Sequence, residues 1–76
     1  MLERIVRRMD EVGVYASEVN EESQLIDLGF NSLLLMEFLV LLEEEFDIEF
    51  KDEDMDVDNF ASVKKIMELI SKYNWK

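Results

Sequence analysis

The chain has 76 residues, 49% of them hydrophobic, and a formal net charge of −11. This length allows one small domain over residues 1–76, and the hydrophobic fraction excludes disorder by composition. The lack of cysteine and histidine excludes disulfides, thiolate metal sites and the usual general base of enzymes.

Acidic residues are concentrated in one long segment. Residues 9–50 contain twelve acidic side chains and neither lysine nor arginine. This charge excludes charge-driven binding to nucleic acid or anionic membranes and favours basic surfaces on partner proteins. The alternative is that the acidity serves solubility alone. The N-terminus lacks the pattern of a signal peptide, and the longest apolar stretch is about half the length that spans a bilayer, so we expect a soluble cytoplasmic protein.

The first predicted helix spans residues 2–12 and ends at Gly13. Apolar residues at spacings of three and four form one stripe, as in an amphipathic helix: Leu2, Ile5, Val6, Met9 and Val12. The i,i+4 spacing predicts two ion pairs of Arg7, one with Glu3 and one with Glu11.

Residues 15–31 show no sustained period and predict a long loop. Four apolar side chains are expected to hold it against the core: Leu25, Ile26, Leu28 and Phe30. A loop of this length in so small a domain is usually functional.

The second predicted helix spans residues 32–46 and is apolar nearly all round. One face is expected to fill the core: Leu35, Phe38, Leu39, Leu42 and Phe46. The opposite face carries three apolar and two acidic residues: Leu33, Met36, Glu37, Val40 and Glu44. A helix of this kind is either wholly buried or has a partner. Because so small a domain cannot easily bury it completely, we expect this second face to bind partner proteins.

The remainder of the chain predicts a short helical turn and a last helix. Residues 51–59 are expected to hold the turn, with Met55 and Val57 or Phe60 pointing inward. Ser62 is a reasonable N-cap, and the last helix has its own apolar stripe: Val63, Ile66, Met67, Ile70 and Tyr73. The expected fold is therefore all-α, a small four-helix bundle of three main helices plus a short third helix.

Two acidic clusters resemble functional sites but fail on closer inspection. The alternating acids Asp54, Asp56 and Asp58 suggest an EF-hand loop, yet the glycine and the bidentate glutamate that such a loop requires are missing. The run of Glu43, Glu44 and Glu45 lies at adjacent helix positions, whose side chains diverge. We expect neither a metal site nor a catalytic residue.

Ser32 has the most distinctive chemical setting, where a glycine-containing loop meets a helix. Its oxygen could cap the helix by accepting a backbone N–H. Alternatively Asn31 is the cap, and Ser32 is the first helical residue. A phosphodiester on Ser32 would then lie near the unpaired N–H groups and positive end of the helix.

The run Asp27-Leu28-Gly29-Phe30-Asn31-Ser32-Leu33 resembles the Asp-Leu-Gly-x-Asp-Ser-Leu motif of acyl carrier proteins and of the related peptidyl carrier domains. Leu42-Glu43-Glu44-Glu45-Phe46 is similar to the Leu-Glu-Glu-Glu-Phe ending of the family's second helix. Phe60-Ala61-Ser62-Val63 is similar to its entry into the last helix. The resemblance covers essentially the whole chain.

The resemblance implies that Ser32 carries 4′-phosphopantetheine, whose thiol holds acyl or aminoacyl groups as thioesters. It implies partners of several kinds: a phosphopantetheinyl transferase, an acyl or aminoacyl ligase, and downstream synthases or transferases of fatty acid, polyketide or nonribosomal peptide synthesis. Asn31 departs from the usual aspartate, which puts in doubt which transferase or partner is accepted. We expect a non-catalytic monomeric carrier. The alternative is an acidic helical interaction module without a prosthetic group, in which Ser32 is only a cap.

Overall fold

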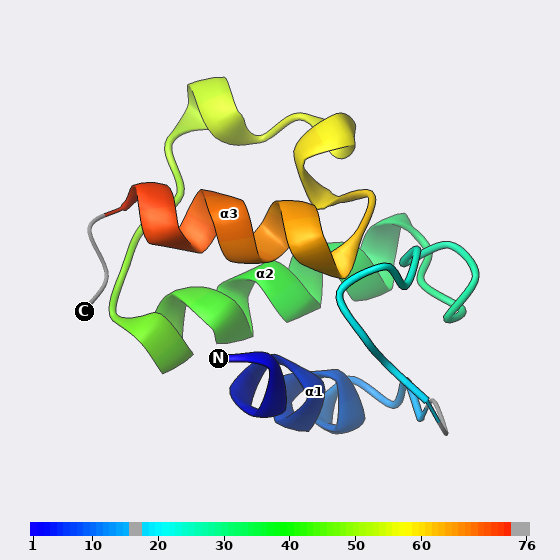
Figure 1. Cartoon of the computed structure of the whole chain (residues 1–76). Helices are drawn as coiled ribbons and strands as arrows, with labels where there is room; N and C mark the ends of the chain where they lie inside the picture. Colours follow the sequence, from blue (N-terminus) through cyan, green and yellow to red (C-terminus); the bar gives the residue numbers. More distant parts are fainter. Residues whose placement is uncertain (16–17, 74–76) are drawn as a thin grey trace.

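The described chain folds into three α-helices, a long loop and two short 3₁₀ turns (Figure 1). The computed structural model describes residues 1–15 and 18–73, except for the side chain of Val57. The α-helices are α1 (Leu2–Glu11), α2 (Ser32–Phe46) and α3 (Val63–Lys72). The 3₁₀ turns η1 (Asp52–Asp54) and η2 (Val57–Phe60) connect α2 to α3. The all-α prediction is confirmed, and the expected short third helix consists of two 3₁₀ turns.

The helices α1 and α2 run antiparallel and are in contact (Figure 1). Glu45 near the end of α2 binds two arginines of α1: Arg4 Nε donates to its Oε2, and Arg8 Nε donates to its Oε1 at 3.0 Å. These hydrogen bonds from Arg4 and Arg8 hold the pKa of Glu45 below its usual value. The two ion pairs predicted for Arg7 are wrong. Arg7 is exposed and forms no ion pair with a described residue, and Glu11 binds Arg8 at 2.8 Å instead.

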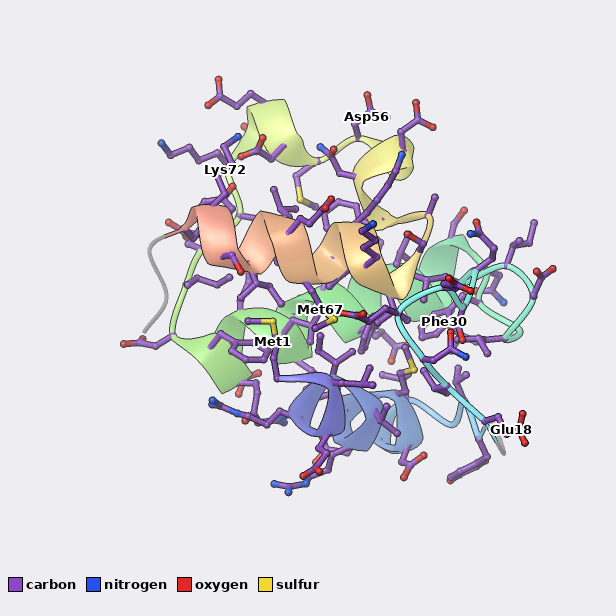
Figure 2. All side chains as sticks on the ribbon, viewed as in Figure 1. Met1, Glu18, Phe30, Asp56, Met67 and Lys72 are labelled. Atoms are coloured by element: carbon purple, nitrogen blue, oxygen red, sulfur yellow. The ribbon has the colours of Figure 1, made fainter. Side chains whose placement is uncertain are left out.

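The predicted apolar stripes meet in one core. Seven of its side chains are fully buried: Ile5, Met9, Phe38, Leu42, Val63, Ile66 and Ile70. Leu35, Met67 and Tyr73 are only half-buried, at the edge of this core. Met1 and Met67 lie next to one another between α1 and α3 (Figure 2). Leu69 is buried although it lies off the predicted stripe, because the segment between α2 and α3 folds over it.

The long loop is held to the core as expected at Leu25 and Phe30, which are buried, and at Leu28, which is half-buried. Ile26 was expected to point inward, but 80% of its surface is exposed. The reason is a backbone hydrogen bond of 3.0 Å from Leu25 N–H to the carbonyl of Ala61, next to an isolated bridge between Gln24 and Ser62. This pairing directs Leu25 inward and leaves Ile26 on the outside.

The segment between α2 and α3 turns inward at Phe60, which is 3% exposed, as predicted. The expectation for Met55 is wrong, because 39% of its surface is exposed, and the side chain of Val57 lies outside the described residues. Asp54 is buried in this segment instead of Met55. Its carboxylate accepts from Lys72 Nζ at 2.9 Å and from the Tyr73 hydroxyl at 2.6 Å.

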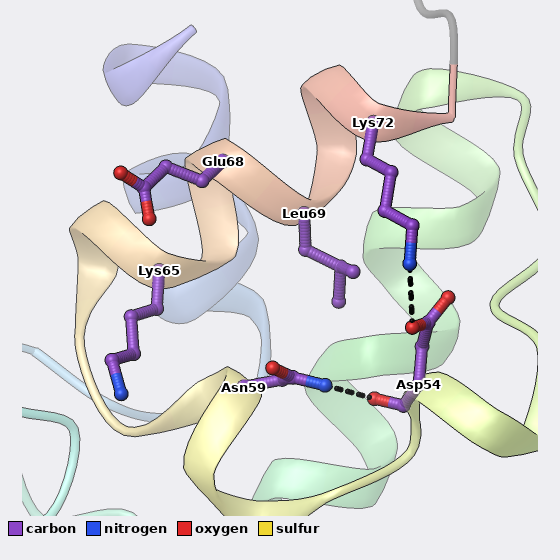
Figure 3. Close-up of a pocket in the computed structure, with 6 residues that line it drawn as sticks. All are labelled: Asp54, Asn59, Lys65, Glu68, Leu69 and Lys72. Atoms are coloured by element: carbon purple, nitrogen blue, oxygen red, sulfur yellow. Dashed lines mark hydrogen bonds and ion pairs between the residues drawn. The ribbon is translucent and has the colours of Figure 1, made fainter.

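Asp54 therefore ties η1 to the end of α3, and it also ties η1 to η2. The backbone carbonyl of Asp54 accepts a hydrogen bond of 2.9 Å from the side-chain amide of Asn59 (Figure 3). The hydrogen bond from Tyr73, followed by that from Lys72, lowers the pKa of the Asp54 carboxyl. A carboxylate with polar partners of this kind is tolerated at a site that would otherwise demand an apolar side chain.

Candidate functional site

The entry into α2 is shaped by a turn at Gly29 and a cap at Asn31. Gly29 has φ of 103°, a region that glycine adopts without steric cost. Asn31 has extended backbone, and its side-chain oxygen accepts from the backbone N–H of Leu34 at 2.9 Å. Of the two alternatives for the cap, Asn31 is therefore the one that the structure adopts, and Ser32 is the first residue of α2.

The side chain of Ser32 is consequently not needed as the cap of α2. Its side chain is exposed, and its hydroxyl forms no hydrogen bond with a described residue. The backbone N–H groups of Ser32 and Leu33 also lack an acceptor among the described residues, as is usual in a first helical turn. No acidic side chain lies in this turn. The site thus combines an available hydroxyl with unpaired donors at the positive end of a helix, which suits an attached anion.

A mostly apolar recess of about 380 Å³ opens beside Ser32. The long loop, the start of α2 and the end of η2 contribute its lining, which contains no charged side chain: Gln24, Leu25, Ile26, Phe30, Asn31, Ser32, Leu35, Phe60 and Ala61. Buried Phe30 packs on Phe38 with ring centroids 5.0 Å apart, so this wall belongs to the core. The recess therefore offers an apolar surface to a neutral group near the Ser32 hydroxyl.

The second face of α2 is exposed, as the helical spacing predicted. The exposed fractions are 68% for Leu33, 54% for Met36 and 52% for Val40, and Glu37 and Glu44 are exposed as well. We name these five residues the α2 outer face. Exposed Ile26 was not among the predicted site residues, although it lines the same recess as Ser32. The sequence could not reveal the exposure of Ile26, because the apolar residues of the loop follow no regular spacing.

The acids of α2 fall into two groups. Glu45 is bound to Arg4 and Arg8, and Glu43 accepts from the backbone N–H of Phe50 at 2.7 Å. Glu37 and Glu44 form no ion pair with the described residues. The carboxylates that hold the fold together are thus separate from those on the α2 outer face.

The acidic turn near η1 and η2 is used within the fold. Asp54 binds Lys72 and Tyr73, and Asp56 accepts from the backbone N–H of Asp58 at 3.0 Å. Within residues 1–15 and 18–73, no three acidic side chains gather as metal ligands would. Over the same residues, no helix is both long and apolar enough to cross a membrane.

Comparison with known proteins shows the family of the chain. A family model described as "Phosphopantetheine attachment site" matches residues 3–70. The chain is 39% identical over 64 residues to the acyl carrier protein of Solidesulfovibrio magneticus, covering 83% of this chain and 76% of that protein. It is 40% identical over 65 residues to the acyl carrier protein of Clostridium acetobutylicum, covering 84% and 82% respectively. The chain belongs to the acyl carrier protein family. Its role is that of an acyl carrier with a covalently attached 4′-phosphopantetheine.

The chain has two further similarities. A segment of 54 residues, 70% of the chain, is 46% identical to 2% of a non-reducing polyketide synthase of Didymella fabae. The fold matches a chain in the crystal structure of Bradyrhizobium japonicum glycine:[carrier protein] ligase complexed with glycylated carrier protein, with a TM-score of 0.70 and 23% identity, over 88% of this chain and 97% of that one. The small helical fold of this chain is therefore shared with a chain of that carrier protein complex.

Proposed function

We propose that Ser32 is the residue that carries the 4′-phosphopantetheine of this carrier. The observation that supports it most is the division of roles at the start of α2: Asn31 caps the helix, so the exposed Ser32 hydroxyl is free to react. A phosphodiester on this oxygen lies close to the unpaired N–H groups of the first turn. The helix dipole stabilises an anion there by roughly 0.3–1 kcal/mol.

The recess beside Ser32 supports the carrying role, since it lies next to the point where the arm would begin. Its uncharged lining would receive apolar parts of the arm or of a thioester-bound group. The cargo we propose is an acyl or aminoacyl group of fatty acid, polyketide or nonribosomal peptide synthesis. The similarity to a polyketide synthase segment and to a carrier fold solved with a glycine ligase supports this range.

The α2 outer face is proposed as the surface on which partner enzymes dock. These partners are a phosphopantetheinyl transferase, an acyl or aminoacyl ligase, and downstream synthases or transferases. Glu37 and Glu44 have no ion pair within the described structure, so their charge is available to basic partner surfaces. The neighbouring Leu33, Met36 and Val40 add exposed apolar contacts.

The carrier acts through its attached arm and not through catalysis of its own. We propose a monomeric single domain over residues 1–76 that works in the cytoplasm. Its acidic charge supports encounters with proteins that have basic surfaces. The other candidate, an acidic interaction module without a prosthetic group, would use the same α2 outer face and leave Ser32 unmodified.

Intact mass after incubation with coenzyme A and a broad-specificity phosphopantetheinyl transferase tests the assignment. We expect the addition of one phosphopantetheine, its loss in Ser32→Ala, and its retention in Ser71→Ala, which removes another exposed serine. Circular dichroism should show equal helical content in both variants. Modification of Ser32→Ala would assign the site to another serine, and an unmodified wild type would favour the interaction module.

A further inference from the structure

The apolar wall of the recess beside Ser32 includes three side chains that remain accessible from outside. Ile26 belongs to the long loop, Leu35 belongs to α2, and Ala61 follows η2. Ile26 is 80% exposed, whereas Leu35 and Ala61 are half-buried. Leu35 lies three residues after Ser32, so the two side chains are neighbours on one face of the helix. A group attached to the Ser32 oxygen therefore has apolar surface next to it.

The exposed position of Ile26 is fixed by the backbone of the residue before it. The N–H of Leu25 donates to the carbonyl of Ala61 at 3.0 Å. The carbonyl of Leu25 accepts from the N–H groups of Leu28 and Phe30, at 3.1 Å and 3.2 Å. A large apolar side chain is thus held in water at a defined place beside the recess. Because this backbone is already ordered, covering the side chain with a ligand requires little further ordering.

The floor of the recess is closed by aromatic rings of the core. Phe30 packs on Phe38. Phe60 packs edge-on against Phe50, with ring centroids 5.6 Å apart. All four rings are buried, so a long chain could enter the core only by displacing closely packed side chains. The volume of about 380 Å³ is at the lower end of the range for small-molecule pockets, roughly 300–1,000 Å³. The recess therefore suits a short apolar group.

We propose that this recess holds the part of the phosphopantetheine arm nearest to Ser32, with Ile26 and Leu35 packed against its gem-dimethyl group. The inference rests on the proposed attachment of the arm to Ser32. It deepens that proposal, because it assigns the recess to the arm itself and not to the thioester-bound cargo.

The chemistry of the arm singles out this part. A methylene and then a carbon with two methyl groups follow the phosphate, and a hydroxyl and two amides separate them from the thiol. The gem-dimethyl group is thus both the bulkiest apolar group of the arm and the one closest to the attachment point. The lining of the recess contains no charged side chain, so it favours an uncharged apolar group of this kind. The thiol at the far end stays outside the recess, where a partner enzyme can reach it.

The test uses isotope-labelled protein loaded to completion with an unlabelled arm, as checked by intact mass. Isotope-filtered NMR then detects nuclear Overhauser effects between the arm and the protein. We expect them between the gem-dimethyl protons and the methyl groups of Ile26 and Leu35. Ile26→Ser should cause loss of the contacts with Leu35, and Ile26→Val should keep them. Leu33→Ser is the matched control and should keep them too, because Leu33 is exposed next to Ser32 but does not line the recess.

Three results would overturn the inference. Contacts of the gem-dimethyl group with Leu33 or Met36 would place the arm on the α2 outer face. A loaded arm without any contact would show that it stays in solvent. In protein whose thiol carries a butyryl group, butyryl contacts with Leu35 in place of the gem-dimethyl contacts would assign the recess to the cargo. Failure of the attachment proposal looks different: the mass shows no added arm, or shows it in Ser32→Ala, and this inference then fails with it.

Discussion

The hydroxyl of Tyr73 donates to Oδ2 of Asp54 at 2.6 Å and accepts from the backbone N–H of Lys51 at 2.8 Å. One side chain at the end of α3 thus binds both ends of η1, at its N-cap Lys51 and at its last residue Asp54. The ring of Tyr73 also packs edge-on against Phe50, with centroids 5.6 Å apart. This cluster holds the segment between α2 and α3 in place, and Phe60 at the end of that segment forms part of the recess beside Ser32.

Asp54→Asn should destabilise the protein near neutral pH and have less effect in acid. The folded-state pKa of Asp54 is lowered, chiefly by the Tyr73 hydrogen bond and then by Lys72. The ionised Asp54 carboxylate therefore adds to the free energy of unfolding at pH values above its pKa in the unfolded chain, about 3.9. This contribution is lost as the pH falls through the lower pKa of the folded state. The difference in urea midpoint between wild type and variant should narrow between about pH 5 and about pH 3. Asp52→Asn, which changes an exposed carboxylate, controls for net charge. A gap that stays constant over this range would contradict the assignment.

Substitutions at Asn31 and at Ser32 should have different effects on stability, because only Asn31 caps α2. Asn31→Ala loses the hydrogen bond to Leu34 N–H and should lower the free energy of unfolding by about 1 kcal/mol. Asn31→Asp keeps a capping oxygen and should stay close to wild type in urea denaturation. Ser32→Ala should also leave the urea midpoint almost unchanged. A large destabilisation by Ser32→Ala would mean that its hydroxyl has a structural role.

The two faces of α2 should respond differently to truncation. Leu42 is fully buried, so Leu42→Ala should cost about 2–5 kcal/mol and can unfold so small a domain. Val40→Ser changes a half-exposed side chain and should hardly alter the thermal midpoint. The same variant should lower the rate at which the transferase modifies the protein at limiting concentrations. Equal destabilisation by both changes would contradict an exposed outer face.

Salt should stabilise the protein. Residues 9–50 hold twelve acids without a basic residue, and Glu37 and Glu44 have no ion pair within the described structure. Their repulsion is screened as the Debye length falls from about 30 Å at 0.01 M to about 8 Å at 0.15 M salt. The melting temperature should rise over this range, and Glu44→Lys should reduce the rise. A melting temperature that is flat in wild type would count against this repulsion.

The helices were predictable because each has an apolar period that the core satisfies. The spacing of Phe38 and Leu42 placed one face inside, and that of Met36 and Val40 placed the other outside. Arg4 and Arg8 bind Glu45, which is far from them in the sequence. The i,i+4 spacing considers only neighbours along one helix, so it predicted ion pairs for Arg7 and missed those of Arg4 and Arg8 with Glu45.

The loop and the segment before α3 were less predictable, because they lack a period. Ile26 faces outward because of a backbone pairing with the entry to α3. Asp54 is buried only because the end of α3 brings Lys72 and Tyr73 to it. The sequence could not show whether Asn31 or Ser32 caps α2, because both residue types are good caps. The extended backbone at Asn31 makes it the cap.

Because the cap at Asn31 is independent of the Ser32 oxygen, adding a group to that oxygen breaks no hydrogen bond that the folded chain makes with its described residues. On the proposed assignment of Ser32, the arm can therefore be attached or removed without rearranging the start of α2. Loading and unloading would then take place at the thiol of the arm, away from the hydrogen bond that holds the start of α2.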